Sequence, residues 1–210
     1  AYYAVPWRGR WNTELGGPTM GLGIHAMDHF LHLMGDWRDV RAAAGTLDRA
    51  IEVEDVSMAI VRFASGAMGS IVNSALSPRQ ETYLRLDYQR ATLELTHLYG
   101  YSRDNWKLTP IPPGPDDSLM QAWQNFPTEI SSSHGAQLNA FVADRDAQRR
   151  PLTSGFQARQ TLELLTAIYK SAFTGEIVPR GSIRPGDPFY TALHGHRAPP
   201  RTKGQPPDRG

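Results

Sequence analysis

DVSMAIVRFASGAMGSIVNSAL, residues 55–76, contains two runs in which larger apolar side chains alternate with small or polar ones. An alternation of period two predicts strands whose successive side chains point to opposite faces of a sheet. Ser65 and Gly66 lie between the runs, where a tight turn belongs. The stretch therefore predicts two neighbouring antiparallel strands.

The period-two pattern continues on both sides of this stretch. It recurs in DVRAAAGTL, ETYLRLDY and ATLELTH, at residues 39–47, 81–88 and 91–97, and Gln89 and Arg90 occupy a second tight connection. Parallel neighbours would need crossover connections of about a dozen residues or more, and these links are shorter. We therefore predict a mostly antiparallel sheet.

A helix is predicted before the strands, at residues 24–34. One face of this helix is apolar and carries Ile24, Met27, Leu31 and Met34 at helical spacing. The opposite face is unusually polar and carries His25, Asp28, His29 and His32. This pattern indicates an amphipathic helix that packs on the sheet through its apolar side.

Two more helices are predicted after a loop rich in Pro and Gly at residues 109–117. They cover about residues 134–148 and 155–173, and Gly175 is placed to end the second. A helix, then antiparallel strands, then helices predict an α+β domain with helices on one face of the sheet. We expect one such domain over residues 1–195, followed by a disordered tail at 196–210 that is too polar to pack.

The other face of the predicted sheet is left without a cover. Several strand residues are small, which favours a flat face: Ser57, Ala59, Ser70 and Ser74. Such a face either contacts a second copy of the chain or is solvated, and the sequence leaves both interpretations open.

Composition narrows the classes of function. The 22 basic residues nearly balance the 21 acidic ones, giving a formal charge of +1, which argues against a nucleic-acid partner. The absence of cysteine excludes disulfides, thiolate metal sites and a cysteine nucleophile. No apolar run approaches the roughly 20 residues that cross a bilayer, and the first residues contain no signal-peptide core. We expect a soluble, cytoplasmic protein without a membrane partner.

GGPTMGLGIHAMDHFLHLMGD, residues 16–36, holds the candidate chemistry and allows three interpretations. The first is a dinucleotide site, because G-L-G-I-H-A fits the pattern G-x-G-x-x-G/A. That fingerprint needs a buried strand before its glycines, whereas the polar, Gly-containing segment RGRWNTELGGPTM precedes them here. The dinucleotide interpretation therefore fails on context.

The second interpretation is a metal site. His25, His29 and His32 stand at i, i+4 and i+7 and present imidazoles on one helix face, with Asp28 as ligand or orienting group. Nothing else in the chain clearly completes a four-ligand shell. The competing interpretation is that His29 and His32 are ordinary solvated helix residues.

The third interpretation makes His25 a group that faces a substrate. In the first turn of a helix, the unpaired N–H groups and the helix dipole disfavour a positive charge on its ring. A neutral imidazole can accept a proton or a hydroxyl hydrogen bond. The competing interpretation is a buried, satisfied core histidine.

Three stretches resemble one known family. GGPTMGLGIHAMDHFLHLMG is similar to the signature that opens the second domain of the Gfo/Idh/MocA oxidoreductases, the family of glucose-fructose oxidoreductase and inositol dehydrogenase. VEDVSMAIVRFASGAMGSI resembles the family's strand pair, and SGFQARQTLELLTAIYKSAFTGEIV its closing helix. The likeness covers most of residues 6–180.

The resemblance implies an open-faced antiparallel sheet backed by helices, which binds a small-molecule substrate and forms homo-oligomers through the sheet. The parent enzymes move a hydride between NAD or NADP and a carbon bearing a hydroxyl, usually of a sugar or polyol. By motif position, His25 matches the active-site histidine and Asp28 the aspartate that supports it. Trp7 and Arg8 fall where the family lines its substrate pocket.

Two departures from the family pattern matter. Gly21 stands where the family commonly has an acidic residue, so either another group replaces that carboxylate or the chemistry differs. The cofactor glycines and the E-K-P lysine of an N-terminal Rossmann domain are also absent. We therefore expect that the chain alone binds no cofactor and is inactive, and that it is a fragment or a partner of a separate Rossmann-domain chain. A non-catalytic assembly module and a metal-dependent enzyme that uses His25, His29 and His32 are the alternatives.

Overall fold

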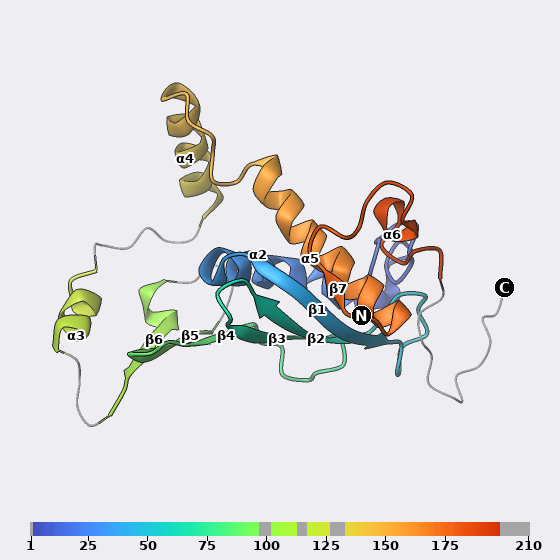
Figure 1. Cartoon of the computed structure of the whole chain (residues 1–210), viewed down its shortest axis with the longest axis horizontal. Helices are drawn as coiled ribbons and strands as arrows, with labels where there is room; N and C mark the ends of the chain where they lie inside the picture. Colours follow the sequence, from blue (N-terminus) through green and yellow to red (C-terminus); the bar gives the residue numbers. More distant parts are fainter. Residues whose placement is uncertain (1, 97–101, 113–116, 127–132, 198–210) are drawn as a thin grey trace. The chain divides into compact units, whose positions relative to one another are not determined.

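The computed structural model describes residues 2–96, 102–112, 117–126 and 133–197. Residue contacts divide the chain into two compact units, one formed by residues up to 78 together with those from 155 onward, and the other by residues 79–154. The first unit contains η1 (Tyr2–Ala4), α1 (Pro18–Gly21), α2 (Gly23–Met34), β1 (Trp37–Gly45), β2 (Val56–Phe63), β3 (Met68–Ser74), α5 (Gly155–Thr174), β7 (Val178–Pro179) and α6 (Pro188–Thr191) (Figure 1). The second contains β4 (Tyr83–Asp87), β5 (Ala91–Thr96), η2 (Arg103–Asn105), β6 (Trp106–Pro110), α3 (Asp117–Gln124) and α4 (His134–Asp146).

The first unit is built on an antiparallel sheet of strand order β3-β2-β1-β7. The predicted hairpin is confirmed: β2 and β3 pair in register from Val56↔Ser74 to Arg62↔Met68. Gly66 adopts a φ of +90° in the connecting turn, a conformation that residues with a side chain rarely adopt.

The core of this unit lies between one face of the sheet and the helices α2 and α5 (Figure 1). Alternate residues of β2 point into it, among them Val61 and Phe63, and they meet Leu164, Ile168 and other buried side chains of α5. The predicted apolar face of α2 is confirmed, since Met27 is buried and Ile24, Leu31 and Met34 pack against the core. The fold class is therefore α+β, with helices on one face of an open antiparallel sheet.

The four small strand residues lie on two different faces. Ser57 and Ala59 are buried on the helix side, and their register partners are Asn73 and Ile71. Ser70 instead pairs with the exposed Ile60, and so faces the open side of the sheet, as does Ser74. The expectation of a single flat face made of all four residues is wrong, because the hairpin register puts even-numbered residues of both strands outward.

The second unit has its own antiparallel sheet, of order β4-β5-β6, with Leu86, Ala91 and Leu95 buried. Strands β4 and β5, which lie within the ranges predicted at 81–88 and 91–97, belong to this sheet and do not extend the first one. The connection from β3 to β4 contains Pro78, which has no N–H group for a sheet hydrogen bond. The predicted loop at 109–117 begins later than expected, because Thr109 and Pro110 belong to β6.

The later predicted helices are confirmed as α4 and α5, and α3 was not predicted. Gly175, with a φ of +75°, follows α5, and its N–H group donates to the carbonyl of Ser171. Of the predicted tail at 196–210, residues 198–210 lie outside the described residues, and a single domain over 1–195 stays a prediction. Within the described ranges, no helix combines the length and apolar character needed to cross a bilayer.

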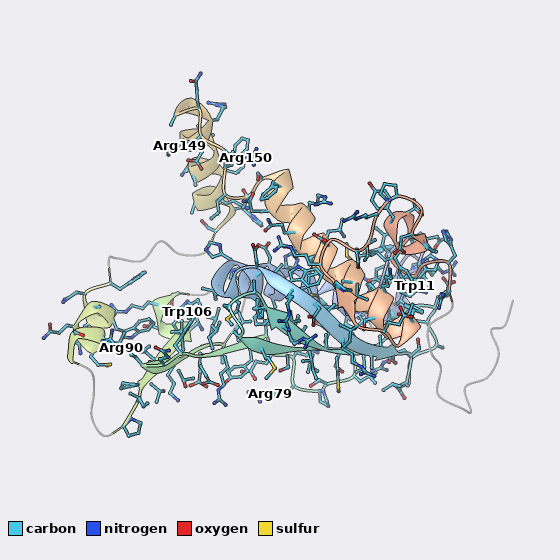
Figure 2. All side chains as sticks on the ribbon, viewed as in Figure 1. Trp11, Arg79, Arg90, Trp106, Arg149 and Arg150 are labelled. Carbon is cyan, nitrogen blue, oxygen red and sulfur yellow. The ribbon has the colours of Figure 1, made fainter. Side chains whose placement is uncertain are left out.

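Residues 185–195, to which the sequence alone assigns no role, pack within the first unit. Phe189 of α6 is buried, and Lys170 of α5 forms an ion pair with Asp187. The ring of His194 stacks on Trp11, with centroids 5.0 Å apart. Figure 2 shows Trp11 beside the end of α5, where it also meets Tyr169 edge to face.

Candidate substrate site

The segment before α2 is held by one buried carboxylate. Glu54 is 1% exposed, and it accepts hydrogen bonds from the N–H groups of Gly17 (2.9 Å) and Thr19 (3.1 Å) and from the hydroxyl of Tyr169 (3.0 Å). Burial raises the pKa of the Glu54 carboxyl, and these hydrogen bonds oppose that rise. A Cβ at Gly17 would lie 1.8 Å from the Glu54 carbonyl oxygen, so only glycine fits there.

His25 lies in the first turn of α2, as predicted, and its side chain is exposed. The interpretation of His25 as a buried core histidine is therefore wrong. The helix that carries it is fixed on its other side by Met27 in the core and by Gly23, whose added Cβ would lie 2.0 Å from Asn73 Oδ1. Close packing thus fixes the position of the turn from which the imidazole projects.

Asp28 joins α2 to α5. Its Oδ1 accepts a 2.7 Å hydrogen bond from the hydroxyl of Thr161, which is 4% exposed. This hydrogen bond holds α2 against α5 about one turn after His25, so Asp28 supports the part of the helix that carries His25. A catalytic contribution from Asp28 stays a prediction.

Arg8 and Trp7 belong to a polar cluster in the N-terminal segment. Arg8 Nη1 lies 3.1 Å from Glu14 Oε1, and the N–H of Gly9 donates to Glu14 Oε2 at 2.5 Å. The guanidinium of Arg8 stacks over the rings of Tyr2 and Trp7, at 3.7 and 4.4 Å from their centroids. The Glu14 side chain is only 5% exposed, so this ion pair is partly shielded from solvent.

This cluster lies next to Gly21. The Cβ that Gly21 lacks would lie 3.6 Å from Glu14 Oε1 and 3.6 Å from the hydroxyl oxygen of Tyr2. Gly21 ends α1 four residues before His25. The structure therefore brings Gly21 and Arg8 together through Glu14. Sequence reasoning missed Glu14 and Tyr2, although the carboxylate absent at Gly21 was a signal to search for a replacement.

The other two interpretations of this segment gain no support. Among the residues with described positions, no group of three or more His, Asp or Glu side chains is arranged to hold a metal ion. The Nδ1 of His29 instead contacts the carbonyl of His25 at 3.1 Å. The glycines of G-L-G-I-H-A lie at the junction of α1 and α2. The elements that precede this junction, within residues 2–21, are η1 and α1, so the glycines do not follow a strand. These residues do not fit a dinucleotide.

Two solved oxidoreductase structures share this fold. The WlbA dehydrogenase from Bordetella pertussis, solved in complex with NADH and UDP-GlcNAcA, is 30% identical, with a TM-score of 0.67 and coverage of 85% of this chain and 50% of that one. Aldose-aldose oxidoreductase from Caulobacter crescentus, complexed with glycerol, is 23% identical and shares the fold at a TM-score of 0.65, over 82% of this chain and 50% of its own.

The sequence comparisons bear on the resemblance to the Gfo/Idh/MocA family. Residues 2–95 match the family model described as the GFO/IDH/MocA C-terminal domain. The D-apiose dehydrogenase of Paraburkholderia graminis is 29% identical over 181 residues, which cover 81% of this chain and 47% of that protein. The predicted resemblance is confirmed for residues 2–95, which match the GFO/IDH/MocA C-terminal domain, and the chain spans about half the length of the relatives it matches.

Proposed function

We propose that this chain is the substrate-binding and oligomerisation part of an NAD- or NADP-dependent oxidoreductase that acts on a CH–OH group of a sugar- or polyol-like molecule. The observation that carries the proposal is the exposed His25 at the start of α2, four residues after a glycine bordered by Tyr2 and by Glu14, which binds Arg8. The relatives named above, which act on or bind sugar-like molecules, support it.

In this proposal His25 acts on the reacting hydroxyl. Its imidazole accepts the hydroxyl hydrogen bond and takes up the proton as the hydroxyl carbon is oxidised. Glu54 holds the preceding loop, and Asp28 holds the helix against α5, so that the ring stays in one place. Trp7 and Arg8 border the ligand. The cofactor binds outside the residues described here, on a Rossmann domain of the same protein or on a separate chain.

The test is turnover of a sugar or polyol in the presence of the cofactor-binding domain. His25→Ala should lower turnover by about 100- to 10,000-fold, the usual contribution of general acid–base catalysis. His32→Ala is the matched control, because His32 is an exposed histidine of the same helix two turns further on. Equal rates for the wild type and His25→Ala would contradict the role of His25.

The oligomerisation part of the proposal rests on the open face of the first sheet. Four large apolar side chains of β2 and β3 are strongly exposed there: Met58 (55%), Ile60 (59%), Met68 (73%) and Val72 (63%). We propose that a second copy of the chain covers them, because an apolar face of this kind is costly to leave in water.

The oligomerisation test is the mass in solution, measured by sedimentation or light scattering. Ile60→Asp should convert the oligomer to a monomer, whereas Glu81→Gln, outside β2 and β3, should not. A monomeric wild type would refute this part. Oligomers that bind no sugar would instead favour the alternative function, a non-catalytic assembly module.

A further inference from the structure

The space over Gly21 is bordered by a carboxylate. Gly21 is exposed and has no side chain, and the atoms nearest to the missing Cβ are Glu14 Oε1 and the Tyr2 hydroxyl oxygen, each at 3.6 Å. A ligand that approaches His25 over Gly21 therefore meets these two oxygen atoms. Neither residue lies in the motif at residues 16–36.

The Glu14 carboxylate is rigidly held. The N–H of Gly9 donates to Oε2 at 2.5 Å, and Arg8 contacts Oε1 at 3.1 Å. Gly9 is itself fixed, because its φ is +76° and an added Cβ would lie 2.6 Å from Ile51 Cγ2. The carbonyl of Gly9 also accepts a hydrogen bond from the N–H of Glu52 at 2.8 Å. The carboxylate is thus positioned before any ligand arrives.

The charge distribution favours a neutral, hydroxyl-bearing ligand. The positive charge of Arg8 is matched by Glu14 and lies over the rings of Tyr2 and Trp7, while the oxygen that borders Gly21 belongs to Glu14. An ionised carboxylate has about four acceptor positions, and Gly9, Arg8 and Tyr2 contribute three donors. Oε1 accepts from Arg8 at 3.1 Å and from the Tyr2 hydroxyl at only 3.4 Å, so a ligand hydroxyl above Gly21 would replace the long Tyr2 contact, whereas a second carboxylate would be repelled.

We infer that Glu14 contacts the substrate and selects neutral sugars or polyols over sugar acids, with its carboxylate accepting a hydrogen bond from a ligand hydroxyl above Gly21. This inference rests on the proposed function of the site. Glu14 acts on specificity and needs no proton transfer of its own.

The experiment is calorimetric titration of the full chain with two matched pairs of probes, D-glucose against D-glucuronate and D-galactose against D-galacturonate, while NMR follows the ring of His25. The wild type should bind the neutral member of a pair at least about 10-fold more tightly. Glu14→Gln should weaken binding of the neutral sugar about 10-fold or more, because a charged hydrogen bond is lost, and should reduce the discrimination against the acid. Glu176→Gln, an exposed carboxylate of the same unit, should change neither quantity.

A second variant guards against misfolding of Glu14→Gln. Gly21→Ala places a methyl group 3.6 Å from Glu14 Oε1 and from the Tyr2 hydroxyl oxygen, which is an ordinary contact distance, and the backbone φ of residue 21 is not positive. The fold should therefore tolerate the substitution, while the space beside Glu14 becomes narrower. It should also weaken sugar binding. Two results would overturn the inference about Glu14 and leave the proposed function standing. In the first, sugars shift the His25 resonances of both variants with wild-type affinity. In the second, the wild type binds the acids more tightly than the neutral sugars. If no probe disturbs His25 in the wild type, both are overturned.

Discussion

Replacing Glu54 tests whether one buried carboxylate holds the loop that leads to His25. Glu54→Ala leaves three buried donors without a partner: the N–H groups of Gly17 and Thr19 and the hydroxyl of Tyr169. An unpaired buried donor costs about 1–3 kcal/mol, so the three together should lower the free energy of unfolding by at least about 3 kcal/mol. Glu54→Gln keeps one acceptor oxygen and sets an amide N–H₂ against a donor, which should cost about 1–2 kcal/mol.

The assay is urea unfolding followed by circular dichroism. The matched control is Glu52→Gln, because Glu52 lies two residues away and is exposed; its effect should stay within about 0.5 kcal/mol. Glu54→Gln should also weaken sugar binding at His25, since the loop would lose part of its anchor. A free energy of unfolding for Glu54→Ala within about 1 kcal/mol of the wild type would refute the reasoning.

The pH dependence gives a second measurement of the same contact. Burial raises the pKa of Glu54 in the folded protein above its ordinary value of 4.5. A carboxyl whose folded-state pKa is raised stabilises the fold fully below its unfolded-state pKa and loses that contribution as the pH rises through the folded-state pKa. Because Glu54→Gln does not titrate, the difference in unfolding free energy between wild type and variant should narrow above pH 4.5. A difference that widens would mean that the three hydrogen bonds outweigh burial.

Three further predictions concern contacts and packing within the first unit. Thr161→Val should lower the free energy of unfolding by about 1 kcal/mol through loss of its hydrogen bond to Asp28, measured by urea unfolding. Gly17→Ala should abolish folding or cost more than about 3 kcal/mol, whereas Gly155→Ala, whose added Cβ meets nothing within 4 Å, should be neutral in the same assay. Hydrogen bonds from Arg62 and Arg38 lower the pKa of Asp39 despite its burial. Asp39 therefore contributes stability above its ordinary pKa of 3.8, and this contribution is lost as the pH falls through the lowered value. The free energy of unfolding, measured over a pH series, should show that loss in the wild type and not in Asp39→Asn.

Local patterns predicted most of the elements. The period-two runs on either side of Ser65 and Gly66 gave the β2–β3 hairpin, and the spacing of Ile24, Met27 and Leu31 gave α2 with its buried face. Such patterns depend on neighbours within one or two turns, which a sequence displays directly. Strands β6 and β7 escaped prediction: β6 overlaps the predicted Pro- and Gly-rich loop, and β7 is only two residues long.

Long-range partners could not be predicted in the same way. Glu54 reaches Gly17 across 37 positions and Tyr169 across 115, and neither pairing leaves a local pattern. The strands at 83–87 and 91–96 have the same periodicity as the first hairpin, so the sequence pattern did not indicate that they form a separate sheet. His25 and Gly21 were recognised from a motif, whereas Glu14 became visible only when folding brought it beside Gly21.

The measurement that tests the central claim most directly is the NMR titration of the full chain with a panel of neutral sugars and polyols, read at the ring resonances of His25. The exposed His32 of the same helix is the internal reference. We predict a saturable shift at His25 with at least one neutral member of the panel and no comparable shift at His32. A flat response at His25 across the whole panel, in a protein that is folded by circular dichroism, would contradict a substrate site at the start of α2.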